Sequence, residues 1–278
     1  MDNVNHFRRL AIIWFFVSVI ATLLVVLLLA PILPPGNGSV EASGQVVDNT
    51  VLLGVSTPVA TAVLVYFIYA LIVFRERDPT AVVDGPPIRG HSTIQTWWLV
   101  VTTGTVLFLA GYGTIRLLAD GAGGGQGPSP IATPVHANSA LQVQVIAQQW
   151  KFTYRWPGYG GMETPRLELP ASRLIEFHVT SLDVIHSFWA YQLGVKADAN
   201  PGYDNIAYVT TKGPQTFNIH CAELCGVFHG YMFETGKVVP QSQFAVWIAQ
   251  QRRQYAPGTK ALPPYSKQYF PQPQRLGG

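Results

Sequence analysis

The sequence predicts a membrane α-helical anchor of two to three transmembrane helices, followed by a water-facing domain made only of β-strands. Two observations support this fold class. The first 115 residues contain three long apolar runs without any charged side chain. After residue 140, short stretches rich in aromatic and β-branched residues alternate with Pro and Gly, which is typical of a β-sandwich or a β-barrel.

Each apolar run is long enough to cross a lipid bilayer. The runs are 10–33, 50–74 and 94–115, and spanning the hydrocarbon core takes about 20 residues. Helices buried in a soluble core are the alternative. Three uninterrupted runs of this length favour membrane helices, because a helix satisfies all its backbone polar groups internally.

The basic residues predict the orientation. Arginines precede the first run and lie between the second and third runs, whereas segment 34–49 contains Glu41 and Asp48 but no Lys or Arg. Under the positive-inside bias, everything after residue 116 lies outside the cytoplasm. We therefore expect a multi-pass protein of a cell membrane, most simply a bacterial plasma membrane, with the β domain on its periplasmic face. The first run could instead be a cleaved signal peptide, but its 24 apolar residues exceed the usual core of about 7–15, so a retained helix is expected.

Composition favours lipid as a partner and argues against nucleic acid. The formal net charge is +3, and no basic cluster with interleaved aromatic residues occurs, so lipid is an expected partner and nucleic acid is not. The chain divides into five parts: an N-terminal membrane helix or signal peptide with an outer loop (1–49), a transmembrane hairpin (50–118), a Gly/Pro-rich linker (119–140), the β domain (141–254) and a Pro/Gln-rich C-terminal tail (255–278).

The β domain is expected to consist of short strands closed by one helix. Alternating or aromatic stretches predict strands at 141–146, 150–156, 166–169, 174–180, 206–211 and 215–220. An amphipathic helix is expected at 241–254, and the tail is expected to be extended or disordered.

The side chains best suited to metal binding gather around the only two cysteines. Cys221 and Cys225 are followed by His229 and Met232, and His186 lies in a separate stretch. Outside the cytoplasm, two cysteines could simply form a disulfide, but a disulfide does not explain the imidazoles and the thioether beside them. Sulfur with imidazole favours copper, or zinc in a closed tetrahedral site. Because structural zinc makes no use of Met, the sequence predicts copper.

Three motifs resemble subunit II of the haem–copper cytochrome c oxidases: DVIHSF (183–188), LGVKADANPG (193–202) and CAELCGVFHGYM (221–232). The resemblance implies a cupredoxin-type Greek-key β-barrel with a dinuclear copper centre, CuA. In that family two thiolates bridge both copper ions, and each ion has one histidine. Carried over to this chain, the implied ligands are His186, Cys221, the backbone carbonyl of Glu223, Cys225, His229 and Met232.

The same resemblance implies a function and partners. The copper centre would accept electrons from cytochrome c, or from a neighbouring complex containing it, and pass them to haem in subunit I. Oxygen would be reduced to water there, with proton translocation by the assembled subunits. Trp150 lies in an aromatic stretch that resembles the place where the electron arrives, and the Glu223 carboxylate would reach a magnesium ion shared with subunit I. Four apolar side chains are expected to keep water from the sulfurs: Phe188, Trp189, Val227 and Phe228.

Several positions depart from the family pattern. His220 stands where relatives usually carry Gln, and strand alternation is expected to point its ring away from the metal. Gln95 stands where many relatives carry a Glu at the start of a proton path, and it cannot ionise. Tyr203 replaces a usual Arg, whereas Lys196 and Asp198 match and are expected at the subunit interface. The remaining histidines have no matching partners and receive no role.

Three other functions remain open on the sequence. A nitric oxide reductase could use a CuA subunit of the same kind, and turnover of oxygen against nitric oxide would separate the two. A membrane-anchored copper carrier would exchange its metal rapidly with a weak chelator. A thiol–disulfide oxidoreductase would use Cys221 and Cys225 without metal.

Overall fold

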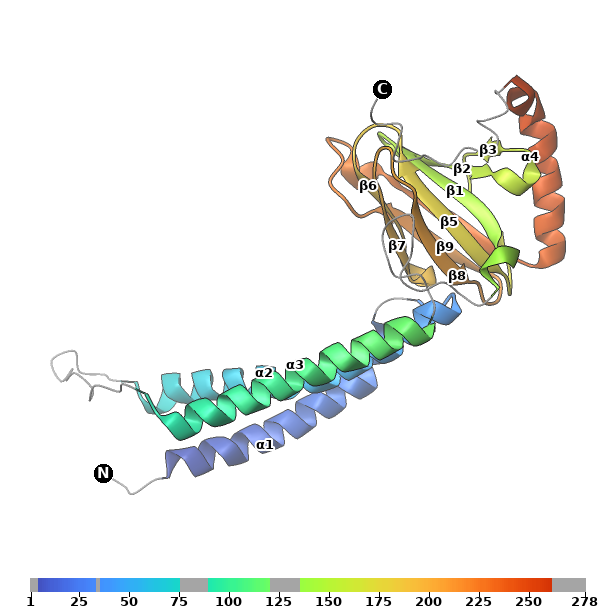
Figure 1. Ribbon diagram of the computed structural model, residues 1–278. Coiled ribbons are helices and arrows are strands. Elements are labelled where there is room, and N and C mark those ends of the chain that lie inside the picture. The colour runs from blue at the N-terminus through green and yellow to red at the C-terminus, as the bar shows by residue number, and fades with distance from the viewer. Residues whose placement is uncertain (1–4, 34–35, 76–89, 121–135, 262–278) are drawn as a thin grey trace. The chain divides into compact units, whose positions relative to one another are not determined.

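The computed structural model describes residues 5–33, 36–75, 90–120 and 136–261 (Figure 1). The described residues form two compact units. Those within 1–33 and 47–115 form the helical unit, and those within 34–46 and 116–278 form the outer unit. Most of the predicted linker and the end of the predicted tail lie outside the described residues.

The helical unit consists of long apolar helices. α1 spans His6–Leu24 and continues through a π-helical turn (Val25–Leu29) and a 3-10 turn (Ala30–Ile32), α2 spans Val40–Val73, and α3 spans Ser92–Asp120. Within the described residues, three helical segments are long and apolar enough to cross a membrane: His6–Ile32, Val40–Val73 and Ser92–Ala119. The three apolar runs are therefore helices, as predicted.

Polar contacts join α1 to α2 within the helical unit. The Trp14 indole N–H donates to the Pro58 carbonyl (2.9 Å), and the His6 ring is hydrogen-bonded to the Tyr69 hydroxyl (2.8 Å). Many of the apolar side chains of α1 and α2 remain exposed, which is the pattern of helices that face lipid.

α2 begins earlier than the apolar run predicts. The segment 34–49 was expected as an outer loop, but the helix starts at Val40. Ser39 caps it, because its hydroxyl accepts a hydrogen bond from the Ala42 N–H (2.8 Å).

The beginning of α2 also contacts the β domain within the outer unit. The Glu41 carboxylate accepts a hydrogen bond from the Thr210 N–H (2.7 Å), and Ser39 forms an isolated antiparallel β-bridge with Thr211. The polar residues of this segment therefore have partners, which explains why it is ordered and why apolar periodicity alone misses it.

The β domain is a sandwich of two five-stranded sheets over its described residues (Figure 1). Its strands are β1 (Leu141–Gln148), β2 (Lys151–Trp156), β3 (Met162–Thr164), β4 (Glu168–Pro170), β5 (Leu174–Ser181), β6 (His186–Ala190), β7 (Val195–Ala199), β8 (Asn205–Thr210), β9 (Gln215–Cys221) and β10 (Phe233–Val239). The strand orders are β3-β2-β1-β5-β8 and β4-β10-β9-β6-β7.

Both sheets mix parallel and antiparallel pairs. β1 pairs in parallel with β5, and β10 with β4, while the other pairs are antiparallel. The facing sides of the sheets enclose a fully buried core that includes Val145, Phe177, Phe188 and Ile219. The predicted cupredoxin-type fold on a helical anchor is confirmed.

The six predicted strands are present, but four strands were not predicted: β3, β6, β7 and β10. β7 has the sequence VKADA and β10 contains Gly236 and Lys237. Ala, Asp, Lys and Gly have low strand preferences. These strands form because neighbouring strands pair with them, which a local pattern does not reveal.

α4 spans Gln241–Ala261 and contacts β3 and β4. Phe244 and Ile248 are buried, and Trp156 lies against Phe244 with ring centroids 5.9 Å apart. The predicted helix at 241–254 is confirmed but continues further. Tyr255, which was assigned to an extended tail, packs on the core, and this contact favours continuation of the helix.

Candidate metal centre

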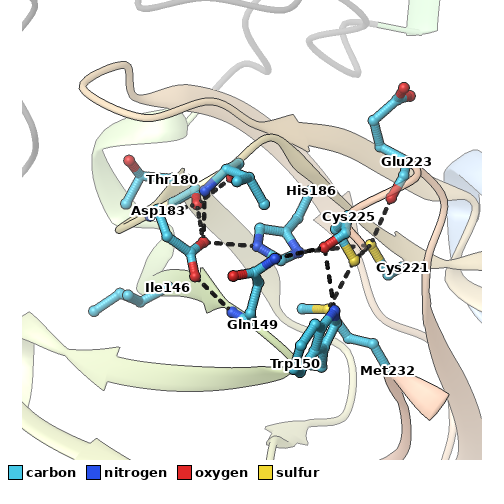
Figure 2. A network of polar contacts seen from close by, with 12 residues as sticks. Ile146, Gln149, Trp150, Thr180, Asp183, His186, Cys221, Glu223, Cys225 and Met232 are labelled. Atoms are coloured by element: carbon cyan, nitrogen blue, oxygen red, sulfur yellow. Dashed lines mark hydrogen bonds and ion pairs between the residues drawn. The ribbon is translucent and has the colours of Figure 1, made fainter. Parts of the chain in front are cut away.

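Two chain segments meet at the candidate metal centre (Figure 2). Cys221 ends β9, Cys225 lies in the loop that follows, and His186 begins β6. Since β6 and β9 are neighbours whose register pairs Phe188 with Cys221, the start of β6 lies beside the cysteine loop.

Backbone hydrogen bonds fold the cysteine loop back on itself. The Cys221 N–H donates to the Met232 carbonyl (3.0 Å), and the Met232 N–H donates to the His229 carbonyl (3.1 Å). The Ala222 N–H donates to the Ser187 carbonyl (3.0 Å) and joins the loop to β6. His229 and Met232 are thereby turned toward the cysteines.

The five side chains predicted as ligands lie together. The two cysteine sulfurs are 3.7 Å apart, and the Met232 sulfur lies 3.9 Å from the Cys225 sulfur. Nδ1 of His186 lies 3.8 Å from the Cys221 sulfur, and Nδ1 of His229 lies 3.5 Å from the Cys225 sulfur. Each imidazole therefore approaches a different cysteine.

The two sulfurs are not joined in a disulfide. Their separation of 3.7 Å far exceeds a disulfide bond of about 2.05 Å, and both cysteines are free and buried. Side-chain donor atoms of His186, Cys221 and Cys225 all lie within 4.8 Å of one another. This group could hold a metal ion.

Burial affects the protonation of the Cys225 thiol. Burial, and then the neighbouring Cys221 sulfur, raise the pKa of the Cys225 thiol to about 12. The thiol therefore keeps its proton at neutral pH when no cation is present. A metal ion that binds thiolate must displace that proton, so metal affinity at this site falls as the pH is lowered.

Asp183 orients the His186 ring. Its Oδ1 lies 2.9 Å from Nε2 of His186, which leaves Nδ1 turned toward Cys221. Burial alone would raise the pKa of Asp183, but hydrogen bonds from the Gln149 N–H, His186 and the Val184 N–H outweigh it and lower the pKa. A carboxylate on the outer nitrogen fixes the tautomer that offers the inner nitrogen to a metal.

Glu223 turns its backbone, rather than its side chain, toward the cysteines. The Cys221 thiol donates to the Glu223 carbonyl (3.2 Å). Figure 2 shows the Glu223 carboxylate pointing away from the sulfur pair, and the residue is exposed. The carbonyl is thus placed where the resemblance predicts a ligand oxygen.

Trp150 lies in the turn between β1 and β2 instead of inside the predicted strand. Its indole N–H donates to the Cys225 carbonyl (3.1 Å), and its ring meets Phe228 edge-on with centroids 4.8 Å apart. The side chain thus contacts the backbone of a candidate ligand directly. Sequence reasoning did not predict this hydrogen bond.

Of the four apolar side chains expected to keep water from the sulfurs, Phe188 is the one that is buried. Phe188 is fully buried, whereas Val227 is 86% exposed, Phe228 50% and Trp189 39%. Strand alternation explains Trp189, which faces away from the core and pairs with His220. Val227 and Phe228 extend from the cysteine loop to the surface of the outer unit.

Within the outer unit, His220, which departs from the family pattern, faces away from the sulfurs. The His220 ring lies 5.6 Å from that of Tyr191 and 5.9 Å from that of Phe233, on the side of β9 opposite Cys221, as strand alternation predicts. Tyr203, which also departs from the pattern, is exposed, as is Lys196, which matches it, and Gln95 lies in the first turn of α3.

A buried histidine outside the metal centre was missed. His178 on β5 is hydrogen-bonded to Asp204 (2.7 Å) and lies 3.6 Å from the Glu176 carboxylate. Burial alone would lower the pKa of His178, but the hydrogen bonds and charges of Asp204 and Glu176 raise it to about 9. Its hydrogen-bond partner Asp204 lies 26 positions away in the sequence, so no local pattern shows this contact.

Comparison with known proteins identifies the outer unit. A family profile described as "Cytochrome C oxidase subunit II, periplasmic domain" matches residues 162–239. This range contains the cysteine loop and His186. The chain carries a cytochrome c oxidase subunit II domain. The recognition made from the three motifs is confirmed.

Relatives named as cytochrome c oxidase subunit 2 match parts of this chain. Cytochrome c oxidase subunit 2 of a Synechocystis strain is 28% identical over 66% of this chain and 64% of its own length. A probable cytochrome c oxidase subunit 2 of Rickettsia prowazekii is 33% identical over 39% of this chain and 42% of its own length. The chain thus spans less than two thirds of the length of these relatives.

Among solved structures, the periplasmic domain of cytochrome oxidase subunit II from Bradyrhizobium japonicum is similar to this chain. It is 28% identical, with a TM-score of 0.41, and the match covers 42% of this chain and 96% of that domain.

Proposed function

We propose that this chain is the copper-containing subunit II of a respiratory terminal oxidase. In this role it accepts electrons from cytochrome c and passes them to haem in subunit I, where oxygen is reduced to water with proton translocation. The observation that carries the proposal is the convergence of two thiols, two imidazoles and a thioether, with their closest contacts between 3.5 and 3.9 Å. The names of the relatives support the same role.

The donor chemistry fits a pair of copper ions. Thiolate, imidazole and thioether are the ligands that copper electron-transfer sites prefer. Two thiols 3.7 Å apart, with one imidazole near each, can be shared by two ions. The proposed ligands are His186, Cys221, the Glu223 carbonyl, Cys225, His229 and Met232.

Bound copper would supply one-electron redox chemistry, and the chain would supply a fixed shape. Backbone hydrogen bonds hold the cysteine loop closed, and Asp183 fixes the His186 ring. Cys221, Cys225 and Met232 are buried, so water has little access to the sulfurs. Ligands that hardly move between redox states keep the reorganisation energy small, which favours rapid electron transfer.

Trp150 is the proposed point of electron uptake. Its indole contacts the Cys225 carbonyl, and its ring contacts Phe228. Val227 and Tyr231 are 86% and 76% exposed nearby on the same loop. An exposed apolar surface of this kind is typical of a contact site for a protein partner.

Position in the membrane and the remaining partners belong to the same proposal. Among the described residues, three helices that are long and apolar enough to span a membrane precede the subunit II domain in the sequence. The arginine distribution favours a bacterial plasma membrane with this domain on the periplasmic side. The exposed Glu223 carboxylate is the group proposed to reach magnesium at the contact with subunit I.

Electron spin resonance of the copper-loaded full chain tests the proposal. One unpaired electron shared equally between two copper nuclei is expected, with two copper ions per chain and slow loss to a chelator. Hyperfine coupling to a single copper nucleus would contradict the dinuclear centre. Rapid exchange with a weak chelator would instead favour a copper carrier, and turnover of nitric oxide but not oxygen by the purified assembly would favour a reductase.

A further inference from the structure

The turn between β1 and β2 touches both halves of the candidate metal centre. The turn contains Gln149 and Trp150. One half of the centre is the His186 segment before β6, and the other is the cysteine loop after β9. These halves are separate in the sequence, and in Figure 2 dashed lines join Gln149 of the turn to Asp183 and to Cys225.

Gln149 contacts each half with a different group. Its backbone N–H donates to Oδ2 of Asp183 (2.8 Å). Oδ1 of the same carboxylate is hydrogen-bonded to Nε2 of His186 (2.9 Å). Its side-chain amide donates to the carbonyl of Cys225 (2.9 Å). One residue therefore links the support of a candidate histidine ligand to the backbone of a candidate cysteine ligand.

The cysteine loop is shaped to allow this contact. Gly226 follows Cys225 and has φ of +114°, a conformation that other residues rarely adopt. A Cβ at this position would lie 3.0 Å from Nε2 of Gln149 and 3.3 Å from Cζ2 of Trp150. Glycine thus lets the turn approach the loop closely enough for both donors to reach one carbonyl.

We propose that Gln149 is a positioning residue for the metal centre, which fixes the Cys225 half relative to the His186 half. The inference rests on the proposed copper function. Trp150 shares this task, because its indole N–H is the second donor to the Cys225 carbonyl. The hydrogen bond of Trp150 therefore contributes to positioning the metal centre, whereas its aromatic ring contributes to the proposed electron uptake.

The test compares Gln149→Ala with Gln142→Ala in the full chain. Gln142 is a matched control, because it is an exposed glutamine of the same strand region whose amide donates to Glu176 (3.2 Å), away from the sulfurs. A net hydrogen bond predicts roughly two- to tenfold faster loss of copper to a chelator in Gln149→Ala. A shifted midpoint potential and an altered hyperfine pattern are also expected, since a merely structural change would not move them.

A metal-free measurement completes the test. Cys225 is only 3% exposed, so alkylation of its thiol requires the loop to open. In the reduced, metal-free chain, alkylation should be severalfold faster in Gln149→Ala than in Gln142→Ala. The double variant Gln149→Ala/Trp150→Phe lacks both donors to the Cys225 carbonyl. Its alkylation rate should exceed that expected from the sum of the two single effects.

Two results would overturn the inference and are distinguishable from each other. If Gln149→Ala matches Gln142→Ala in alkylation, copper loss and midpoint potential while the parent chain shows the shared-electron pattern, Gln149 has no positioning role. If the parent chain itself lacks that pattern, the proposed function fails and the inference fails with it.

Discussion

The histidine buried on β5 makes the stability of the outer unit depend on pH. His178 has an ordinary pKa of 6.5, and its partners raise it to about 9. One pKa unit corresponds to about 1.4 kcal/mol. Protonation of His178 therefore contributes on the order of 3 kcal/mol to the free energy of unfolding.

The direction in which stability changes with pH follows from the raised pKa of His178. Below pH 6.5 both the folded and the unfolded chain carry the proton, and the full contribution is present. As the pH rises from 6.5 through about 9, the unfolded chain loses the proton first, so the contribution of His178 disappears. Stability should therefore fall across this range.

Urea unfolding of the full chain in detergent, followed by tryptophan fluorescence, measures this effect. The parent protein and His178→Gln are compared at about pH 6 and about pH 9.5, and the loss of stability should be about 3 kcal/mol larger in the parent. Burial raises the pKa of Glu234 to about 8, but both proteins retain this group, so its contribution cancels. Asp204→Asn should also reduce the pH dependence. Equal losses in the parent and His178→Gln would contradict a raised pKa of His178 in the folded chain.

Three further substitutions test other parts of the structure. Phe188→Ala removes a fully buried ring from the core and should cost about 3–5 kcal/mol in urea unfolding; a loss below about 1 kcal/mol would contradict the packing. Asp183→Asn removes the charge beside His186 and should weaken copper retention about 10- to 100-fold in a chelator competition, with Asp198→Asn as the control. Trp150→Ala should slow reduction by an external cytochrome c severalfold in stopped-flow absorbance, whereas Trp150→Phe should lose less because an aromatic ring still faces Phe228; equal rates in all three proteins would exclude uptake through this side chain.

The sequence predicted the parts of the molecule that depend on local patterns. Apolar runs identified the helices, and alternation identified six of the strands. The cysteine loop was predictable because Cys221, Cys225, His229 and Met232 lie within twelve residues of sequence. His186 was found only because a motif marks it, since its approach to Cys221 depends on the pairing of β6 with β9.

Contacts between distant residues were not predictable. The hydrogen bond between Gln149 and Cys225 joins residues 76 positions apart, and the ion pair of His178 with Asp204 joins residues 26 positions apart. Side-chain type does not reveal either contact. The same limit applies to Val227, which was expected to help keep water from the sulfurs: its hydrophobicity did not reveal that its position in the loop leaves it exposed.

The contact between the start of α2 and the β domain also affects how the domain can be isolated. β8 is the last strand of its sheet, and such an edge strand offers unpaired backbone groups to other chains. Here the Glu41 carboxylate accepts a hydrogen bond from the Thr210 N–H, and Ser39 forms an isolated β-bridge with Thr211. A truncated fragment that starts after the membrane helices would lack both residues and expose this edge as a template for self-association. Ser39 and Glu41 thus cover part of this edge, and we expect a soluble version of the domain that keeps them to self-associate less than one that begins after the membrane helices.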